Sequence, residues 1–184
     1  MIVYKLTNQN MTTYGSFKWK VGEIYNTTGK GNLCSPGWLH AYETPLLAVL
    51  HNPIHGNFKD PKLFKADTLD GTINKDGQMK LGSTKMKLIE EIKLPKISKI
   101  QNIAYGILCA KAVYKDKQYN KWADKWLSGE NRSKKSAAAA YNAAAYNADV
   151  AAYAAAYNAA AAVVDAADIN INLIKIAKIA ITYK

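Results

Sequence analysis

The sequence predicts an α+β fold, in which a small twisted antiparallel sheet with packed helices is followed by a long alanine-rich C-terminal helix. Three observations predict it. Short β-rich segments separated by turns fill the first half, helical periodicity replaces them after Pro95, and residues 137–162 contain seventeen alanines in twenty-six positions. Because the composition changes so sharply, we expect a basic α+β domain over residues 1–132 and an alanine-rich helical assembly tail over residues 133–184.

The expected strands are short and end in turn signals. IVYKLT at residues 2–7 is rich in β-branched and aromatic side chains and precedes the turn-prone NQN. Residues 14–20 alternate aromatic with small or basic side chains, which predicts a second strand. Two more strands are expected over residues 63–69 and 86–94, and Pro95 ends the last of them.

Helical signals begin at Thr44 and Pro45, which are typical of an N-cap and a first helical position, so the following LLAVLH should form a short helix. Apolar residues at spacings of three and four predict an amphipathic helix over residues 97–113, with Cys109 near its buried side. A further helix follows and ends at Ser128-Gly129. One face of it is apolar and consists of Trp122, Ala123, Trp126 and Leu127.

The tail from about Ser133 is expected to be helical, because alanine has the highest helix propensity. Its larger side chains form a heptad seam: Tyr146, Val150, Tyr153, Tyr157, Ala160, Val164, Ala167, Ile171 and Ile174. A rod with so few charges would expose a large apolar surface if it stood alone. We therefore expect a homo-oligomer that forms through this helix, in preference to packing on the helix that carries Trp122. For residues 169–184, a helix is favoured over a strand.

The whole formal net charge of +11 lies in residues 1–136. This favours an anionic partner, although a lysine coat that serves only solubility stays open. Arg132 is the single arginine, which disfavours sequence-specific DNA binding because that relies on arginine forks. No apolar run approaches the ~20 residues of a membrane span. Two cysteines, Cys34 and Cys109, and no signal segment indicate a cytoplasmic protein.

Residues 31–56, GNLCSPGWLHAYETPLLAVLHNPIHG, contain all three histidines and one cysteine. A metal site is disfavoured, because Pro53 interrupts the helix that would align His51 with His55. Cys34 could pair with a histidine as a nucleophile, but no local signature accompanies it. Phosphate-binding loop motifs are absent as well. We therefore expect no metal, no cofactor and no catalytic residue.

Ligand binding by a mixture of side chains remains. Trp38 and Tyr42 offer flat faces on which a base can stack, and His40 can form hydrogen bonds to the base or sugar. A phosphate is expected to be held by Lys80, Ser83, Thr84 and Arg132. The competing interpretation is that Trp38 and Tyr42 anchor the core and that LGSTK at residues 81–85 is only the start of a strand.

Several segments together resemble a family of small, uncharacterised bacteriophage proteins with a GWLHAY-like core and a long alanine-rich C-terminal helix. They are CSPGWLHAYETPLLAVLHNPIHG, LGSTK, GILCAKAVY and WLSGENRS before the alanine tract. The resemblance spans nearly the whole chain, with Asn131 where the family often has Asp. The first half is also similar to phage domains of unknown function with a GFHAC-like segment. This chain lacks the second cysteine of that segment, which further disfavours a metal role.

The resemblance implies a phage protein that acts in the cytoplasm of an infected bacterial host. Some small phage proteins assemble into oligomers and trap the nucleotide signals of host immunity. By this analogy, we expect a non-enzymatic protein that sequesters a nucleotide-like anionic ligand as a counter-defence sponge. Two alternatives stay open: an enzyme of the ADP-ribosyl-transfer type with His40 as a positioning group, and a structural protein that works through its helical tail.

Overall fold

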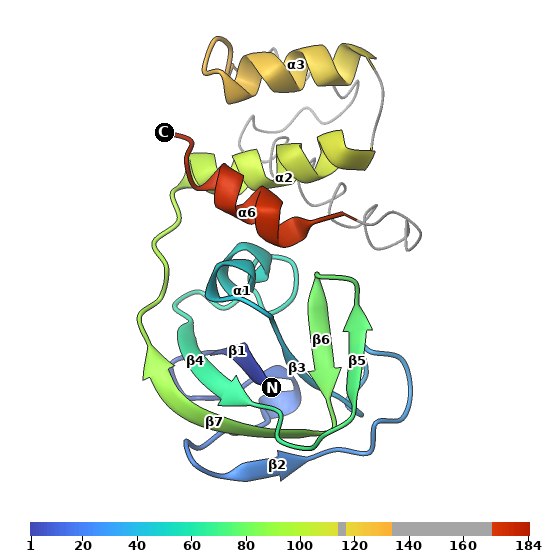
Figure 1. Cartoon of the computed structure of the whole chain (residues 1–184). Coiled ribbons are helices and arrows are strands. Elements are labelled where there is room, and N and C mark those ends of the chain that lie inside the picture. The colour runs from blue at the N-terminus through green and yellow to red at the C-terminus, as the bar shows by residue number, and fades with distance from the viewer. Residues whose placement is uncertain (114–116, 134–170) are drawn as a thin grey trace. The chain divides into compact units, whose positions relative to one another are not determined.

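The computed structural model describes residues 1–113, 117–133 and 171–184. The chain divides into two compact units, Met1–Lys96 and Ile97–Lys184 (Figure 1). The described residues form two small antiparallel sheets and four α-helices, which confirms the predicted α+β class. The division between the units precedes the boundary expected at 132/133, so the two helices expected in the basic domain lie in the second unit.

The first unit contains both sheets. The larger has the order β1-β4-β7-β2 and consists of β1 (Ile2–Thr7), β4 (Lys62–Asp67), β7 (Lys85–Ile92) and β2 (Ile24–Asn26). The smaller has the order β3-β6-β5 and consists of β3 (Leu39–Ala41), β6 (Lys80–Ser83) and β5 (Ile73–Asp76). The strands expected at residues 2–7, 63–69 and 86–94 are therefore confirmed, as β1, β4 and β7.

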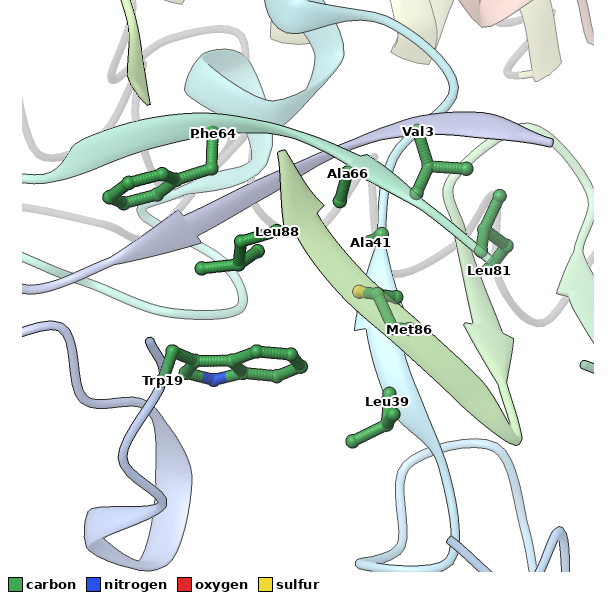
Figure 2. Close-up of a cluster of buried hydrophobic side chains, with 9 residues drawn as sticks. All are labelled: Val3, Trp19, Leu39, Ala41, Phe64, Ala66, Leu81, Met86 and Leu88. Carbon is green, nitrogen blue, oxygen red and sulfur yellow. The ribbon is translucent and has the colours of Figure 1, made fainter. Parts of the chain in front are cut away.

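Two backbone hydrogen bonds join the sheets. Tyr4 of β1 donates to the Tyr42 carbonyl over 2.8 Å, and Tyr42 donates back to the Tyr4 carbonyl over 2.9 Å. Side chains from both sheets meet in one apolar core, which Figure 2 shows with the Trp19 indole beneath Leu88 in the view. The members are Val3, Trp19, Leu39, Ala41, Phe64, Ala66, Leu81, Met86 and Leu88.

The prediction of a strand over residues 14–20 is wrong. Tyr14–Ser16 form a 3₁₀ turn, in which Gly15 has φ 65° and Ser16 has φ 59°. Two consecutive left-handed residues reverse the chain, so the alternating side chains cannot continue along one extended segment. The turn folds the segment on itself, as the bridge between Thr12 and Lys18 shows.

The short helix α1 (Pro45–His51) confirms the expectation from Thr44 and Pro45. The Thr44 hydroxyl accepts a hydrogen bond from the Leu47 amide over 3.2 Å, and Pro45 occupies the start of the helix. The helix packs against β1. Its inward face consists of Leu47, Ala48, Leu50 and His51, all of which are buried.

We expect Thr44→Ala to lower the free energy of unfolding by about 1 kcal/mol, because the Leu47 amide loses its side-chain acceptor at the helix start. Thr44→Ser retains the oxygen and should unfold at nearly the same urea concentration as the wild type. Equal urea midpoints for all three proteins would show that the cap does not stabilise α1.

The second unit contains α2 (Lys99–Val113), α3 (Lys117–Leu127) and α6 (Leu173–Ala180), and α2 packs against both α3 and α6. The expected helices over 97–113 and around Trp122 are confirmed. Cys109 is buried, as expected, and burial raises the pKa of its thiol to about 12. The apolar face expected on α3 is also buried, together with Tyr119.

Helix α6 confirms, for Leu173–Ala180, the prediction of a helix in preference to a strand within residues 169–184. Its buried side chains are Leu173, Ala177 and Ala180, so the heptad seam expected through Ile171 and Ile174 does not set its inward face. The reason is packing: α6 lies on α2, and the residues that fit that neighbour are buried. The rest of the seam, and most of the predicted tail helix, lie outside the described residues. Homo-oligomer formation through the tail therefore stays a prediction.

Of the helices described, none has the length and apolar composition that a membrane crossing requires.

Candidate functional site: an aromatic cavity with two lysines

The first unit contains a cavity of about 380 Å³. Its walls come from β1, β3, the start of β6, the loop before β3, the turn after α1 and the segment around residues 13–19. Six aromatic side chains line it: Tyr14, Phe17, Trp19, Trp38, Tyr42 and Phe58. Its volume lies within the range of about 300–1,000 Å³ that is usual for small-molecule sites.

The polar lining is entirely neutral or basic. Lys5, Lys80, His40 and His55 reach the cavity, and none of the lining residues described is an aspartate or a glutamate. A site with two amines and no carboxylate attracts anions, and its low-dielectric aromatic walls strengthen that attraction.

Lys5 is the most buried of these cations, with 7% of its surface exposed. Its Nζ donates a hydrogen bond to the His40 carbonyl over 2.6 Å and lies 5.0 Å from the centroid of the Trp19 ring. Burial lowers the pKa of Lys5 to about 7, because a charged amine loses its hydration in this environment. Near neutral pH, Lys5 is therefore divided between its charged and neutral forms.

Phe17 and Trp19 line one wall, and their rings form a cluster with Tyr25, which lies outside the lining. Trp19 lies 5.1 Å from Phe17 and 4.9 Å from Tyr25, measured between ring centroids. The Trp19 indole N–H donates to the Thr13 hydroxyl over 3.0 Å, and its backbone amide donates to the Met11 carbonyl. These bonds fix the indole, while Phe17 remains 36% exposed at the edge of the cavity.

Trp38 is held by the loop before β3. Its indole N–H donates to the Gly31 carbonyl over 3.1 Å. A Cβ on Gly37 would lie 2.0 Å from the Lys30 carbonyl oxygen, and a Cβ on Gly82 would lie 2.8 Å from the Trp38 Cβ. Both positions therefore need glycine for the loop and β6 to approach so closely. Trp38 is 9% exposed, so it packs in the core and lines the cavity at once.

His40 follows in β3, and its Nε2 forms a hydrogen bond with the Leu33 carbonyl. Because a carbonyl can only accept, Nε2 carries the proton. Burial, with smaller contributions from Lys5 and Lys80, lowers the pKa of His40. The imidazole is therefore neutral at pH 7, and its Nδ1 is a hydrogen-bond acceptor.

Tyr42 and the two histidines after α1 form a second aromatic group. The Tyr42 hydroxyl and His55 Nδ1 share a hydrogen bond of 2.9 Å, and His51 Nδ1 donates to the Met79 carbonyl over 2.9 Å. Burial lowers the pKa of His51 to about 4 and that of His55 to about 3, and it raises the pKa of Tyr42. All three rings are neutral at pH 7.

Lys80 and Cys34 meet at the edge of the cavity, where the Lys80 Nζ lies 2.7 Å from the Cys34 Sγ. Cys34 is exposed and forms no disulfide. No group of three His, Cys, Asp or Glu side chains within the described ranges is placed to hold a metal ion.

Four of the predicted ligand-binding residues, Trp38, His40, Tyr42 and Lys80, line this cavity. Ser83 and Thr84 do not: the Ser83 hydroxyl donates to the Lys85 carbonyl over 2.6 Å, and the Thr84 hydroxyl accepts from the Thr72 amide over 2.8 Å.

Arg132 belongs to the second unit. Its guanidinium lies 4.8 Å from the Trp126 ring centroid and donates to the Trp126 and Lys184 carbonyls. The structure thus gives Arg132 partners of its own within that unit.

The sequence analysis did not predict four of the residues that line the cavity: Lys5, Phe17, Trp19 and Phe58. Lys5 has a recognisable signal, because it lies within the run IVYKLT on the same strand face as Val3 and Thr7, both of which are fully buried. A lysine at a buried strand position lowers the stability of the fold, so its presence there indicates a functional role. The aromatic residues have no comparable signal, since they come together only through the turn at Tyr14–Ser16 and the loop after α1.

Comparison with known proteins agrees with this division of the chain. No curated protein and no solved structure matches the chain significantly. Residues 1–100 match the family described as Domain of unknown function (DUF7666), and this range contains both sheets, α1 and the whole cavity. More than half of the sequence is covered by the match, so the chain belongs to the DUF7666 family.

Proposed function

We propose that the first unit binds a nucleotide-like anionic ligand in its cavity and sequesters it without turnover. The observation that carries this proposal is the lining itself, in which six aromatic residues and two lysines line one cavity, with no carboxylate among the lining residues described. Aromatic faces stack with any base, and amines bind phosphate.

The geometry suggests a role for each part of the lining. Trp38 and Phe17 offer faces for a base, and the neutral His40 imidazole offers an acceptor for a base amino group or a sugar hydroxyl. Lys80 lies at the edge with its amine beside Cys34, where a phosphate can remain partly hydrated. Such a site has an aromatic part that suits the base of a nucleotide and a basic part that suits its phosphate.

The setting of this activity is also part of the proposal. The resemblance to phage proteins favours an infected bacterial cytoplasm, and sequestration of a host nucleotide signal would blunt immune signalling there. A homo-oligomer formed through the alanine-rich tail would supply several such cavities in one particle.

We test binding by titration calorimetry of the full chain with adenosine monophosphate, ADP-ribose and a cyclic dinucleotide. At least one should bind, and Trp38→Ala should weaken that binding by roughly 1–3 kcal/mol through loss of a stacking face. Phe17→Ala repeats the test at a partly exposed position, where loss of the fold is not expected. Absence of heat with all three probes would overturn the proposal.

The charge requirement has a matched control. Lys80→Ala and Lys93→Ala remove the same charge, but only Lys80 lines the cavity. We expect weaker binding for the first variant and unchanged binding for the second. Mass spectrometry of the recovered nucleotide then decides between sequestration and the ADP-ribosyl-transfer alternative, since an enzyme would return an altered product.

A further inference from the structure

Lys5 occupies a core position in β1. The strand alternates so that Val3, Lys5 and Thr7 share one face, and Val3 and Thr7 are fully buried there. The other end of the Lys5 side chain reaches the cavity wall. The chain thus places a buried amine on this face of the sheet, at the wall of the cavity.

The surroundings of this amine differ from those of the surface lysines. Lys75, Lys85 and Lys20 each form an ion pair with a nearby carboxylate, at 2.5 to 2.7 Å. Lys5 has no ion pair with any described residue, and its recorded partners are the His40 carbonyl and the Trp19 ring. The carbonyl accepts from a neutral N–H as well, so of these two partners only the Trp19 ring favours the charged amine.

A neutral lysine has a lone pair, and the lone pair is a nucleophile. One N–H of Lys5 is used by the His40 carbonyl, and none of the described residues donates a hydrogen bond to Nζ. The lone pair therefore has no partner within the described part of the chain. Since burial already lowers the pKa of Lys5 to about 7, forming the neutral amine at physiological pH costs little free energy.

We propose that Lys5 captures carbonyl compounds: its amine condenses reversibly with an aldehyde or ketone group of a ligand seated in the aromatic cavity. This inference rests on the proposed function, since it deepens the ligand class to nucleotide-like molecules with a free carbonyl, such as an open-chain reducing sugar. It also supplies a means of retention without turnover.

The step balances without an oxidant or reductant. The nitrogen lone pair forms a C–N bond while the carbonyl π pair moves to oxygen, which takes up a proton. The resulting carbinolamine loses water as the C=N bond forms, so both amine hydrogens leave in that water. Amine and carbonyl become imine and water, and addition of water reverses the reaction.

Pyridoxal 5′-phosphate is a suitable probe, because it joins an aldehyde to a flat ring and a phosphate. The full chain is incubated with it at pH 7.5, the imine is trapped with borohydride, and modified lysines are mapped by peptide mass spectrometry. At this pH roughly three quarters of an amine with a pKa of about 7 is neutral, against about one in a thousand of an ordinary lysine. We expect Lys5 to be modified roughly tenfold faster than Lys93.

Two measurements distinguish imine formation at Lys5 from non-specific modification of an accessible lysine. The rate of modification at Lys5 should level off above about pH 7, because its amine is then largely neutral. Lys5→Arg retains a hydrogen-bond donor but cannot form an imine, so its residue 5 should stay unmodified.

Competition with adenosine monophosphate distinguishes this inference from the proposed function. Modification of Lys5 that the nucleotide suppresses supports both. Modification without suppression supports carbonyl capture and contradicts binding of adenosine monophosphate in the same cavity. Nucleotide binding by calorimetry with Lys5 modified no faster than Lys93 leaves the proposed function standing and overturns the carbonyl-capture inference.

Discussion

Lys5→Met should raise the free energy of unfolding of the first unit at pH 7, which is an unusual result for a residue in the core. The wild-type amine is 7% exposed and lacks an ion pair among the described residues, so folding removes its hydration without replacing it by a charge partner. Methionine fills a similar volume and has no such penalty. After subtraction of about 1 kcal/mol for the lost bond to the His40 carbonyl, we expect a gain on the order of 2–4 kcal/mol.

The stability gained by Lys5→Met should depend on pH, because the pKa of Lys5 differs between the folded and unfolded states. The pKa of Lys5 is about 7 in the folded state and 10.5 in the unfolded state. Between these values the unfolded chain binds more protons, so the stability of the wild type rises with pH across this window. The advantage of Lys5→Met should therefore be largest at and below about pH 7 and nearly vanish at about pH 10.5.

Urea unfolding followed by tryptophan fluorescence, at several pH values from 7 upward, measures the difference. Lys93→Met is the control, since Lys93 is exposed and the substitution should change stability by less than about 0.5 kcal/mol. A destabilised Lys5→Met protein would mean that the amine forms a stabilising contact. A gain would instead show that the chain retains Lys5 at the expense of stability, as residues with a functional role often are retained.

A second large effect is expected on the acid side. Burial lowers the pKa of His51 to about 4 and that of His55 to about 3, whereas an unfolded histidine has a pKa of 6.5. As the pH falls from 6.5 toward 4, the unfolded chain gains protons that the folded chain does not bind, so stability is lost. His51 alone accounts for a loss on the order of 3 kcal/mol at pH 4.

Carboxylates contribute in a separate window. The N-terminal amine, 2.9 Å from Asp67, holds the pKa of that carboxyl below its usual 3.8, so its stabilising effect disappears only at lower pH. Unfolding measured between pH 4 and 7 therefore reports mainly on the histidines.

His51→Gln retains an N–H donor for the Met79 carbonyl, and His55→Gln retains an amide that can donate to or accept from the Tyr42 hydroxyl. We expect each substitution to flatten the loss of stability between pH 6.5 and 4, and the double substitution to remove most of it. A double variant that loses stability as steeply as the wild type would show that other groups cause the acid sensitivity.

The sequence predicted those elements that carry a long or specific signal. Strand β1 and helices α2 and α3 have apolar patterns over several residues, and α1 has a threonine cap followed by proline. Strands β2 and β3 are only three residues long and pair with distant partners, so no local period marks them. The segment at residues 14–20 shows the opposite error, because alternation there coincides with a tight turn at Gly15.

The site was predictable in part. Trp38, His40, Tyr42 and Lys80 stand out by residue type, and all four line the cavity. Lys5 was not identified, although it shares a strand face with Val3 and Thr7; the Trp19 segment that covers its amine is not visible in a strand of six residues. Chemistry that depends on desolvation is thus harder to predict than chemistry that depends on residue identity.

The reciprocal bonds between Tyr4 and Tyr42 have a consequence for recognition. Because they fasten β1 to β3 beside Lys5 and His40, the two sides of the cavity cannot move apart without the loss of both bonds. The conformational entropy that ordering this pocket costs is therefore lost during folding and not on ligand binding. In the proposed role, such a preorganised pocket would select ligands by rigid fit, and a molecule slightly too wide would be excluded.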